Sequence, residues 1–95
     1  MLKEKPMNIK KQDTVEPITS LHQDGKFFHI ISKLPGIAEE KIKIDIDLEK
    51  TTITIFAADT HIAYKKIISI PGDVIFSNKR FSDGELHLIV EKKVT

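Results

Sequence analysis

With 95 residues, the chain has room for one domain with a thin hydrophobic core, and a second core is excluded. Fifteen basic residues against fourteen acidic ones give a formal net charge of +1, which excludes the strongly basic balance that is typical of nucleic-acid binders. The absence of cysteine excludes disulfides and thiolate chemistry, and because no apolar run has the length of a signal peptide or a membrane span, we expect a soluble, cytoplasmic protein.

The two ends of the chain differ in their pattern. Residues 1–16 are rich in lysine and have no apolar periodicity, which predicts a flexible N-terminal arm. The arm could add a short edge strand, but the pattern does not require one. From residue 17 onward, short segments alternate apolar and polar residues, and each is followed by a turn signal. We therefore predict one folded domain over residues 17–95.

The first two strands are expected over residues 17–23 and 27–34. Asp24-Gly25 separates them, and this pair favours a tight hairpin turn because both residues tolerate positive φ. Pro35-Gly36 ends the second strand, because proline has no N–H to donate to a neighbouring strand. Residues 37–40 then predict a short turn with room for a single helical turn.

Later strands are predicted over residues 41–48, 51–57, 64–70 and 85–92. The first of these, KIKIDIDL, has the cleanest alternation, and the second, TTITIFA, has the β-branched and aromatic residues that strands prefer. Residues 73–81 alternate less regularly and predict a loop with one short strand. About seven short strands without a helical repeat predict an all-β fold, an immunoglobulin-like sandwich of two antiparallel sheets.

The histidines show no signature of a metal site. His22, His29, His61 and His87 share no short ligand spacing, and neither cysteine nor an HExxH motif accompanies them. Asp45, Asp47 and Glu49 superficially resemble a calcium loop, but the required glycine position falls on Lys50. We expect no metal.

Catalytic and nucleotide-binding motifs are also missing. The sequence has no GxSxG elbow, no P-loop and no GxGxxG, and its four glycines all stand in turn signals. No group of residues suggests a nucleophile with its base. We expect neither an enzyme nor a cofactor.

Three motifs, in this order, resemble the α-crystallin domain of small heat shock proteins over roughly residues 17–92. Leu34-Pro35-Gly36-Ile37 followed by residues 39–44 is similar to the family's turn into its groove-forming strand. Residues 64–74 are similar to the family's basic strand and its proline stop, and residues 81–86 (FSDGEL) are similar to its terminal signature.

The departures from the family pattern concern assembly. The linker over residues 58–63 is short for the loop that exchanges a strand between subunits, and no isoleucine-x-isoleucine tail follows the domain. Lys79 stands where the signature has alanine, and Asp83 where asparagine is common. These departures predict a minimal member that forms a monomer or a small homodimer rather than a large oligomer.

The resemblance implies an ATP-independent holdase-type chaperone that binds exposed apolar segments of unfolded or partly folded client proteins at a sheet-edge groove. The groove residues implied in this way are Ile42, Ile44, Ile46, Lys79 and Phe81. Two interpretations of the apolar ones stay open, because they could line a groove or belong to the core. The alternative function is a CS-like adaptor or co-chaperone domain that docks on one specific partner protein. Neither function involves nucleic acid or membrane.

Overall fold

The alternating segments form strands throughout residues 13–93, the part of the chain that the computed structural model describes. The strands are β1 (Asp13–Val15), β2 (Thr19–Asp24), β3 (Phe27–Lys33), β4 (Ile42–Asp47), β5 (Thr52–Ala58), β6 (Ile62–Ser69), β7 (Val74–Ser82) and β8 (Glu85–Lys92). A 3-10 helix, η2 (Glu39–Lys41), occupies the predicted turn before β4. No helix within residues 13–93 has the length and apolarity needed to cross a membrane.

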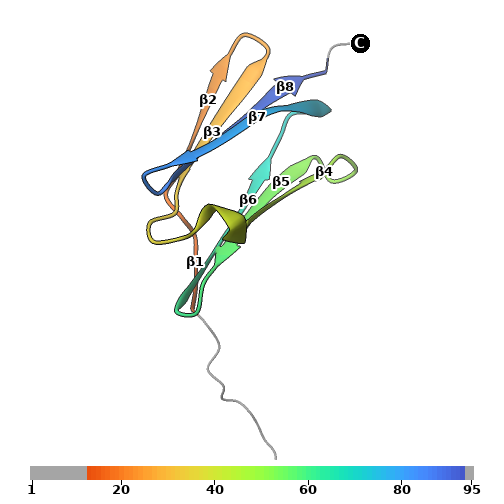
Figure 1. Cartoon of the computed structure of the whole chain (residues 1–95). Coiled ribbons are helices and arrows are strands. Elements are labelled where there is room, and N and C mark those ends of the chain that lie inside the picture. Colours follow the sequence, from red (N-terminus) through yellow and green to blue (C-terminus); the bar gives the residue numbers. More distant parts are fainter. Residues whose placement is uncertain (1–12, 94–95) are drawn as a thin grey trace, which may run out of the picture.

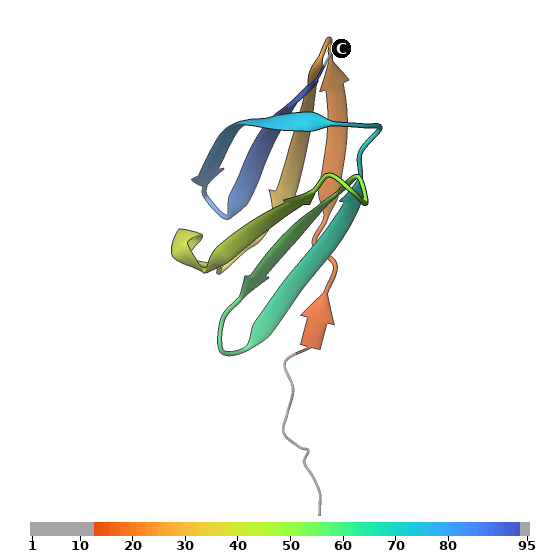
Figure 2. The ribbon, with the colours of Figure 1, turned by 90° about the vertical axis from the view of Figure 1, so that its right-hand side faces the viewer.

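The strands form two four-stranded sheets. The first sheet has the order β1-β6-β5-β4 and the second has the order β2-β3-β8-β7. Neighbouring strands are antiparallel except for β1, which runs parallel to β6. Figures 1 and 2 show the sheets as two layers, with the short β1 at one margin of the first layer. The structure confirms the predicted β-sandwich.

Prolines mark the places where the chain passes from one sheet to the other. Pro17 lies between β1 and β2, Pro35 between β3 and β4, and Pro71 between β6 and β7. Because proline lacks an N–H, it cannot continue a strand ladder, and the chain is free to leave the sheet there. This confirms that Pro35 and Pro71 end strands, as the sequence predicts.

The core fills the space between the facing sides of the sheets. Its largest fully buried apolar side chains are Ile30, Leu34, Ile53, Ile55, Leu86, Leu88 and Val90. Ser32 is buried among them, and its hydroxyl is 2.7 Å from the Thr19 hydroxyl, which in turn donates to the Pro17 carbonyl. The polar group therefore has a partner, so burying it costs little.

Two turns that are far apart in the sequence pack against each other. Asp83 and Gly84 both have positive φ (53° and 74°), as a two-residue hairpin turn between β7 and β8 requires. The Gly84 carbonyl accepts a hydrogen bond from the Leu34 N–H at 2.7 Å. A Cβ at residue 84 would lie 3.3 Å from the Pro35 Cα. The motif Leu34-Pro35-Gly36-Ile37 and the motif of residues 81–86 thus meet at one end of the sandwich.

The structure corrects two sequence predictions. Residues 13–15, assigned to the flexible arm, form β1 and pair with Ile62–Tyr64; the rest of the predicted arm, residues 1–12, lies outside the described residues. Residues 73–81 do not form a loop with one short strand, because β7 runs for nine residues and pairs with β8 along its length. An irregularity in the register between Phe76 and Asn78 disturbs the alternation of apolar and polar residues, so the period-two pattern does not reveal this strand.

The connection between β5 and β6 is a three-residue turn, Asp59–His61. The Asp59 carboxylate accepts hydrogen bonds from the backbone N–H groups of His61 (2.7 Å) and Ile62 (2.8 Å). These two bonds lower the pKa of Asp59 below its ordinary value of 3.8. No segment remains here that could form a further strand for exchange with a neighbour.

The hydrogen-bonded Asp59 predicts how the stability of the protein depends on pH. Because the folded pKa of Asp59 lies below its unfolded value of 3.8, its contribution to stability is present above that pH and is lost as the pH falls through the folded pKa. We expect Asp59→Asn, which keeps a carbonyl acceptor but removes the charge, to lose less stability than wild type between neutral pH and pH values below 3.8. Urea unfolding of both proteins across this range measures the difference, and parallel curves would contradict the assignment.

Candidate functional site

Strands β4 and β7 form neighbouring open edges of the two sheets. Each is the last strand of its sheet, so one side of its backbone has no strand partner within residues 13–93. An edge of this kind presents N–H and C=O groups to which an extended peptide can add as a further strand. The arrangement offers main-chain hydrogen bonding on both sides of one opening.

A groove lies between these two edges. Its volume is about 400 Å³, and Ile44, Ile46, Phe76 and Lys79 line it. Ligand pockets in proteins span roughly 300–1,000 Å³, so this groove has room for side chains of a peptide. Three of the four lining residues are apolar. We call this space the β4–β7 groove.

Strand periodicity explains why the β4 side chains point into the groove. Ile44 pairs with Ile55 and Ile46 pairs with Ile53, and both partners are fully buried on the core side of the first sheet. Paired residues share a face of the sheet. Ile44 and Ile46 therefore extend the core side of the sheet out to its open edge.

A bulge places the two groove residues of β7. Phe76 and Lys79 are three positions apart, so simple alternation would point them to opposite faces. The register skips Ser77, however, so that Phe76 pairs with Val90 and Lys79 with Leu88, both of which are buried. Both side chains consequently face the groove.

The five residues implied by the family resemblance separate into two groups. Ile44, Ile46 and Lys79 line the groove. Ile42 is only 8% exposed and belongs to the core, while the half-buried Phe81 packs against that core. The sequence prediction missed Phe76, and its only signal was the irregular pattern of residues 73–81.

Phe76 is the most exposed apolar side chain of the groove. It is 50% exposed, whereas Ile44 and Ile46 are less exposed than Phe76 and pack against the core. An aromatic ring with this exposure leaves apolar area in contact with water, and covering that area on binding is favourable. The groove therefore carries a free apolar surface at its rim.

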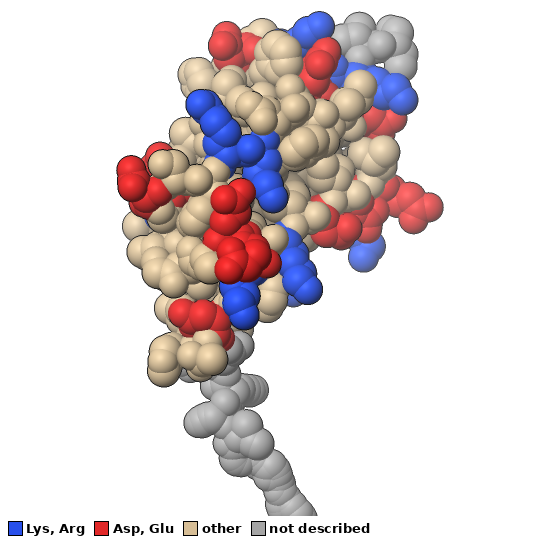
Figure 3. All heavy atoms as spheres, viewed as in Figure 1, with Lys and Arg blue, Asp and Glu red and all other residues tan. Residues whose placement is uncertain are grey.

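The Lys79 side chain takes part in no ion pair within residues 13–93. The ion pairs found within residues 13–93 join Lys26 to Glu91, Lys33 to Glu85 and Lys66 to Glu16. None of these includes Lys79, whose side chain is exposed. Acidic and basic side chains are interspersed over the face shown in Figure 3, without a large patch of one sign.

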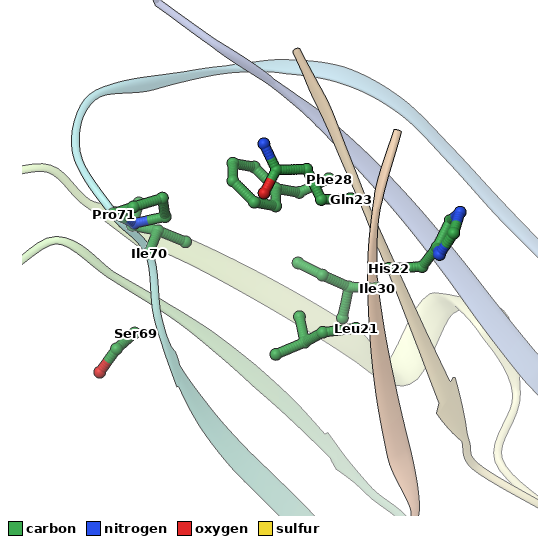
Figure 4. A pocket seen from close by; sticks show the side chains of 8 residues that line it. All are labelled: Leu21, His22, Gln23, Phe28, Ile30, Ser69, Ile70 and Pro71. Carbon is green, nitrogen blue, oxygen red and sulfur yellow. The ribbon is translucent and has the colours of Figure 1, made fainter. Parts of the chain in front are cut away.

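A second cavity lies on the opposite side of the sandwich, between β2 and the end of β6 (Figure 4). Its volume is about 240 Å³, and the side chains of Leu21, Phe28, Ile30, Ile70 and Pro71 form its apolar wall. It is smaller than the β4–β7 groove. Among residues 13–93, no group of three or more histidines and carboxylates is arranged to hold a metal ion.

Comparison of the sequence with known proteins finds neither a matching family model nor a matching curated protein. Solved structures do match. The A102D mutant of hsp14.1 from Sulfolobus solfataricus has a TM-score of 0.71 at 16% identity, with 82% of this chain and 79% of that chain covered. Heat shock protein 16.0 from Schizosaccharomyces pombe also has a TM-score of 0.71 at 16% identity, with 94% and 73% covered.

A third match is a C-terminally truncated form of the small heat shock protein AgsA from Salmonella typhimurium. Its TM-score is 0.71 at 15% identity, and 84% of this chain and 90% of that chain are covered. Identities at this level show a shared fold. The chain therefore has the β-sandwich fold found in small heat shock proteins.

Proposed function

We propose that this protein is an ATP-independent holdase-type chaperone, without enzymatic activity, that binds extended apolar segments of unfolded or partly folded proteins in the β4–β7 groove. The observation that carries the proposal is the half-exposed Phe76 beside Ile44 and Ile46 between two open strand edges. The fold shared with small heat shock proteins supports it.

A client segment would bind as an added strand. Its backbone would pair with an open edge, and every second side chain, about 6.6 Å apart, would reach into the groove. Burying one isoleucine or phenylalanine contributes roughly 1.5–3 kcal/mol. One side chain alone corresponds to weak binding, so a client needs two or more apolar residues at alternate positions to be held.

We further propose that the protein acts as a monomer or a small homodimer in the cytoplasm. The three-residue β5–β6 turn supports this proposal, because it has no length to reach a neighbouring subunit. Small assemblies have few binding sites, so the gain from multivalency is limited. We therefore expect modest holdase activity that requires a molar excess over the client.

Light scattering by a heat-aggregating test protein tests the holdase function. We expect scattering to fall progressively as this protein is added in molar excess, without ATP. A monomeric β-sandwich protein that lacks an apolar groove serves as the control, and size-exclusion chromatography with light scattering gives the subunit number for the molar ratio. Unchanged aggregation at several-fold excess would contradict the proposal.

A second candidate function is an adaptor that docks on one specific partner protein. The short β5–β6 turn favours it as well, since an adaptor needs no large assembly. An adaptor would leave aggregation of the test protein unchanged but would form a discrete complex of fixed stoichiometry with a protein from its own lysate. Identification of that complex by mass spectrometry would distinguish the two functions.

A further inference from the structure

Histidines from three strands lie side by side on the outer face of the second sheet. His22 on β2 is directly opposite His29 on β3, and His87 on β8 is directly opposite Arg80 on β7. His29 pairs with Ile89, two residues from His87, so His29 and His87 are diagonal neighbours. Figure 4 shows the His22 side chain on the other side of β2 from the Leu21 side chain.

The closest atoms in this row are two ring nitrogens. Nδ1 of His29 and Nε2 of His87 are 3.0 Å apart and share a hydrogen bond, whose proton a bound metal ion would replace; the two ring centroids are 5.2 Å apart. Zinc-type metal–imidazole bonds are about 2.0–2.1 Å long, so two nitrogens on one ion are about 2.9 Å apart at a right angle and about 3.4 Å apart at a tetrahedral angle. The observed separation fits the right angle.

We propose that His29 and His87 form a chelating surface site for a divalent transition-metal ion with right-angle coordination, namely Ni²⁺ or Cu²⁺. Imidazole nitrogen suits both ions, and square-planar or octahedral geometry is what they prefer. Water fills the remaining positions, since no third protein ligand converges on the pair within the described residues. The two strands that carry the ligands are the central ones of the sheet and pair with each other, which fixes the backbone positions of both histidines.

The surroundings of the pair define its affinity. The His22 ring lies farther out, with its centroid 6.0 Å from that of His29. Arg80 faces His87 from β7, and its positive charge repels a cation at the site. The nearby Glu85 carboxylate forms an ion pair with Lys33 at 2.8 Å. Burial, followed by the charges of His29 and Arg80, lowers the pKa of His87, and this direction favours the neutral imidazole over the charged one.

A metal ion here would join β3 to β8 without touching the β4–β7 groove. The histidines point outward from the second sheet, whereas Phe76 and Lys79 pair with residues on its core side. Binding to the native state alone stabilises it in proportion to metal concentration. We therefore expect the melting temperature to rise with added Ni²⁺, whether or not the groove binds clients.

Isothermal titration of Ni²⁺ into the full-length chain tests the site. We expect one ion per chain, with affinity reduced roughly tenfold or more in His29→Gln and in His87→Gln. His22→Gln and His61→Gln, which remove histidines outside the pair, should bind like wild type, and Arg80→Gln should bind more tightly. Wild-type affinity in both pair variants, or an equal loss in His22→Gln, would overturn the proposal.

A measurement on the wild-type protein avoids the question of whether the variants fold. Substoichiometric Cu²⁺ broadens amide resonances near its binding site in a nitrogen-proton correlation spectrum. We expect the signals around residues 29 and 87 to disappear first. Broadening that begins around His61 or at the chain ends would overturn the proposed location.

Discussion

Replacing Phe76 with threonine is expected to weaken client binding by about tenfold to a hundredfold. Phe76 is half-exposed at the rim of the β4–β7 groove, and contact with a client side chain there would be worth roughly 1.5–3 kcal/mol. Each 1.4 kcal/mol corresponds to a factor of ten in affinity. Threonine retains a high preference for strands, so β7 should persist. Fluorescence anisotropy of a labelled apolar peptide, together with the aggregation assay, measures the loss.

The neighbouring residue supplies a matched control. Ile75 is 49% exposed, almost the same as Phe76, but it does not line the groove. Ile75→Thr removes a comparable apolar surface from the same strand, and we expect peptide binding to stay at the wild-type level. Equal losses in the two variants would show that general surface apolarity, not the groove, holds the peptide.

Replacing Leu88 with alanine is expected to cost about 2–5 kcal/mol of unfolding free energy. Leu88 is fully buried on β8, one of the two central strands of the second sheet, and lies opposite Ile30 on β3. Removing its branched end leaves a cavity that the surrounding strands fill only in part. The total free energy of unfolding of a native protein is only about 5–15 kcal/mol, so this substitution removes a large share of the stability. Urea unfolding with an unchanged m-value would measure the loss.

Leu21→Ala is the matched control for the core. Leu21 also projects toward the space between the sheets, but it lies on the open edge strand β2 and is 58% exposed. Truncating an exposed side chain usually changes stability by about 0.5 kcal/mol or less. If Leu88→Ala and Leu21→Ala cost the same, Leu88 would not occupy the core position that the structure assigns to it.

Most of the fold could be predicted from short-range features, because a regularly alternating strand shows its pattern within its own segment. Residues 41–48 alternate strictly, and β4 occupies Ile42–Asp47. Pro35 and Pro71 stop strands by their chemistry alone, and Asp83-Gly84 adopts the positive φ values that a tight hairpin turn needs. β1 could not be foreseen in this way, because its three residues gain their hydrogen bonds from β6, some fifty residues away.

The candidate site was predictable only in part. Ile44 and Ile46 follow from the period of β4, which presents one apolar face. Phe76 does not follow, because its direction relative to Lys79 depends on the skipped Ser77, and a bulge is defined by pairing with another strand. The open edges of β4 and β7 likewise depend on the order of strands in the two sheets.

The histidines show the same division most clearly. His29 and His87 are 58 positions apart in the chain and carry no spacing that suggests a shared role, yet pairing of β3 with β8 brings their nitrogens to 3.0 Å. The sequence by itself determined the regularly alternating strands β2 to β6 and β8, the turns that follow them and their apolar faces, because these depend on residues next to each other. Only the tertiary structure decided which edges stay open, which side chains line the groove and which histidines meet, because strand register and sheet order arise from contacts between distant segments.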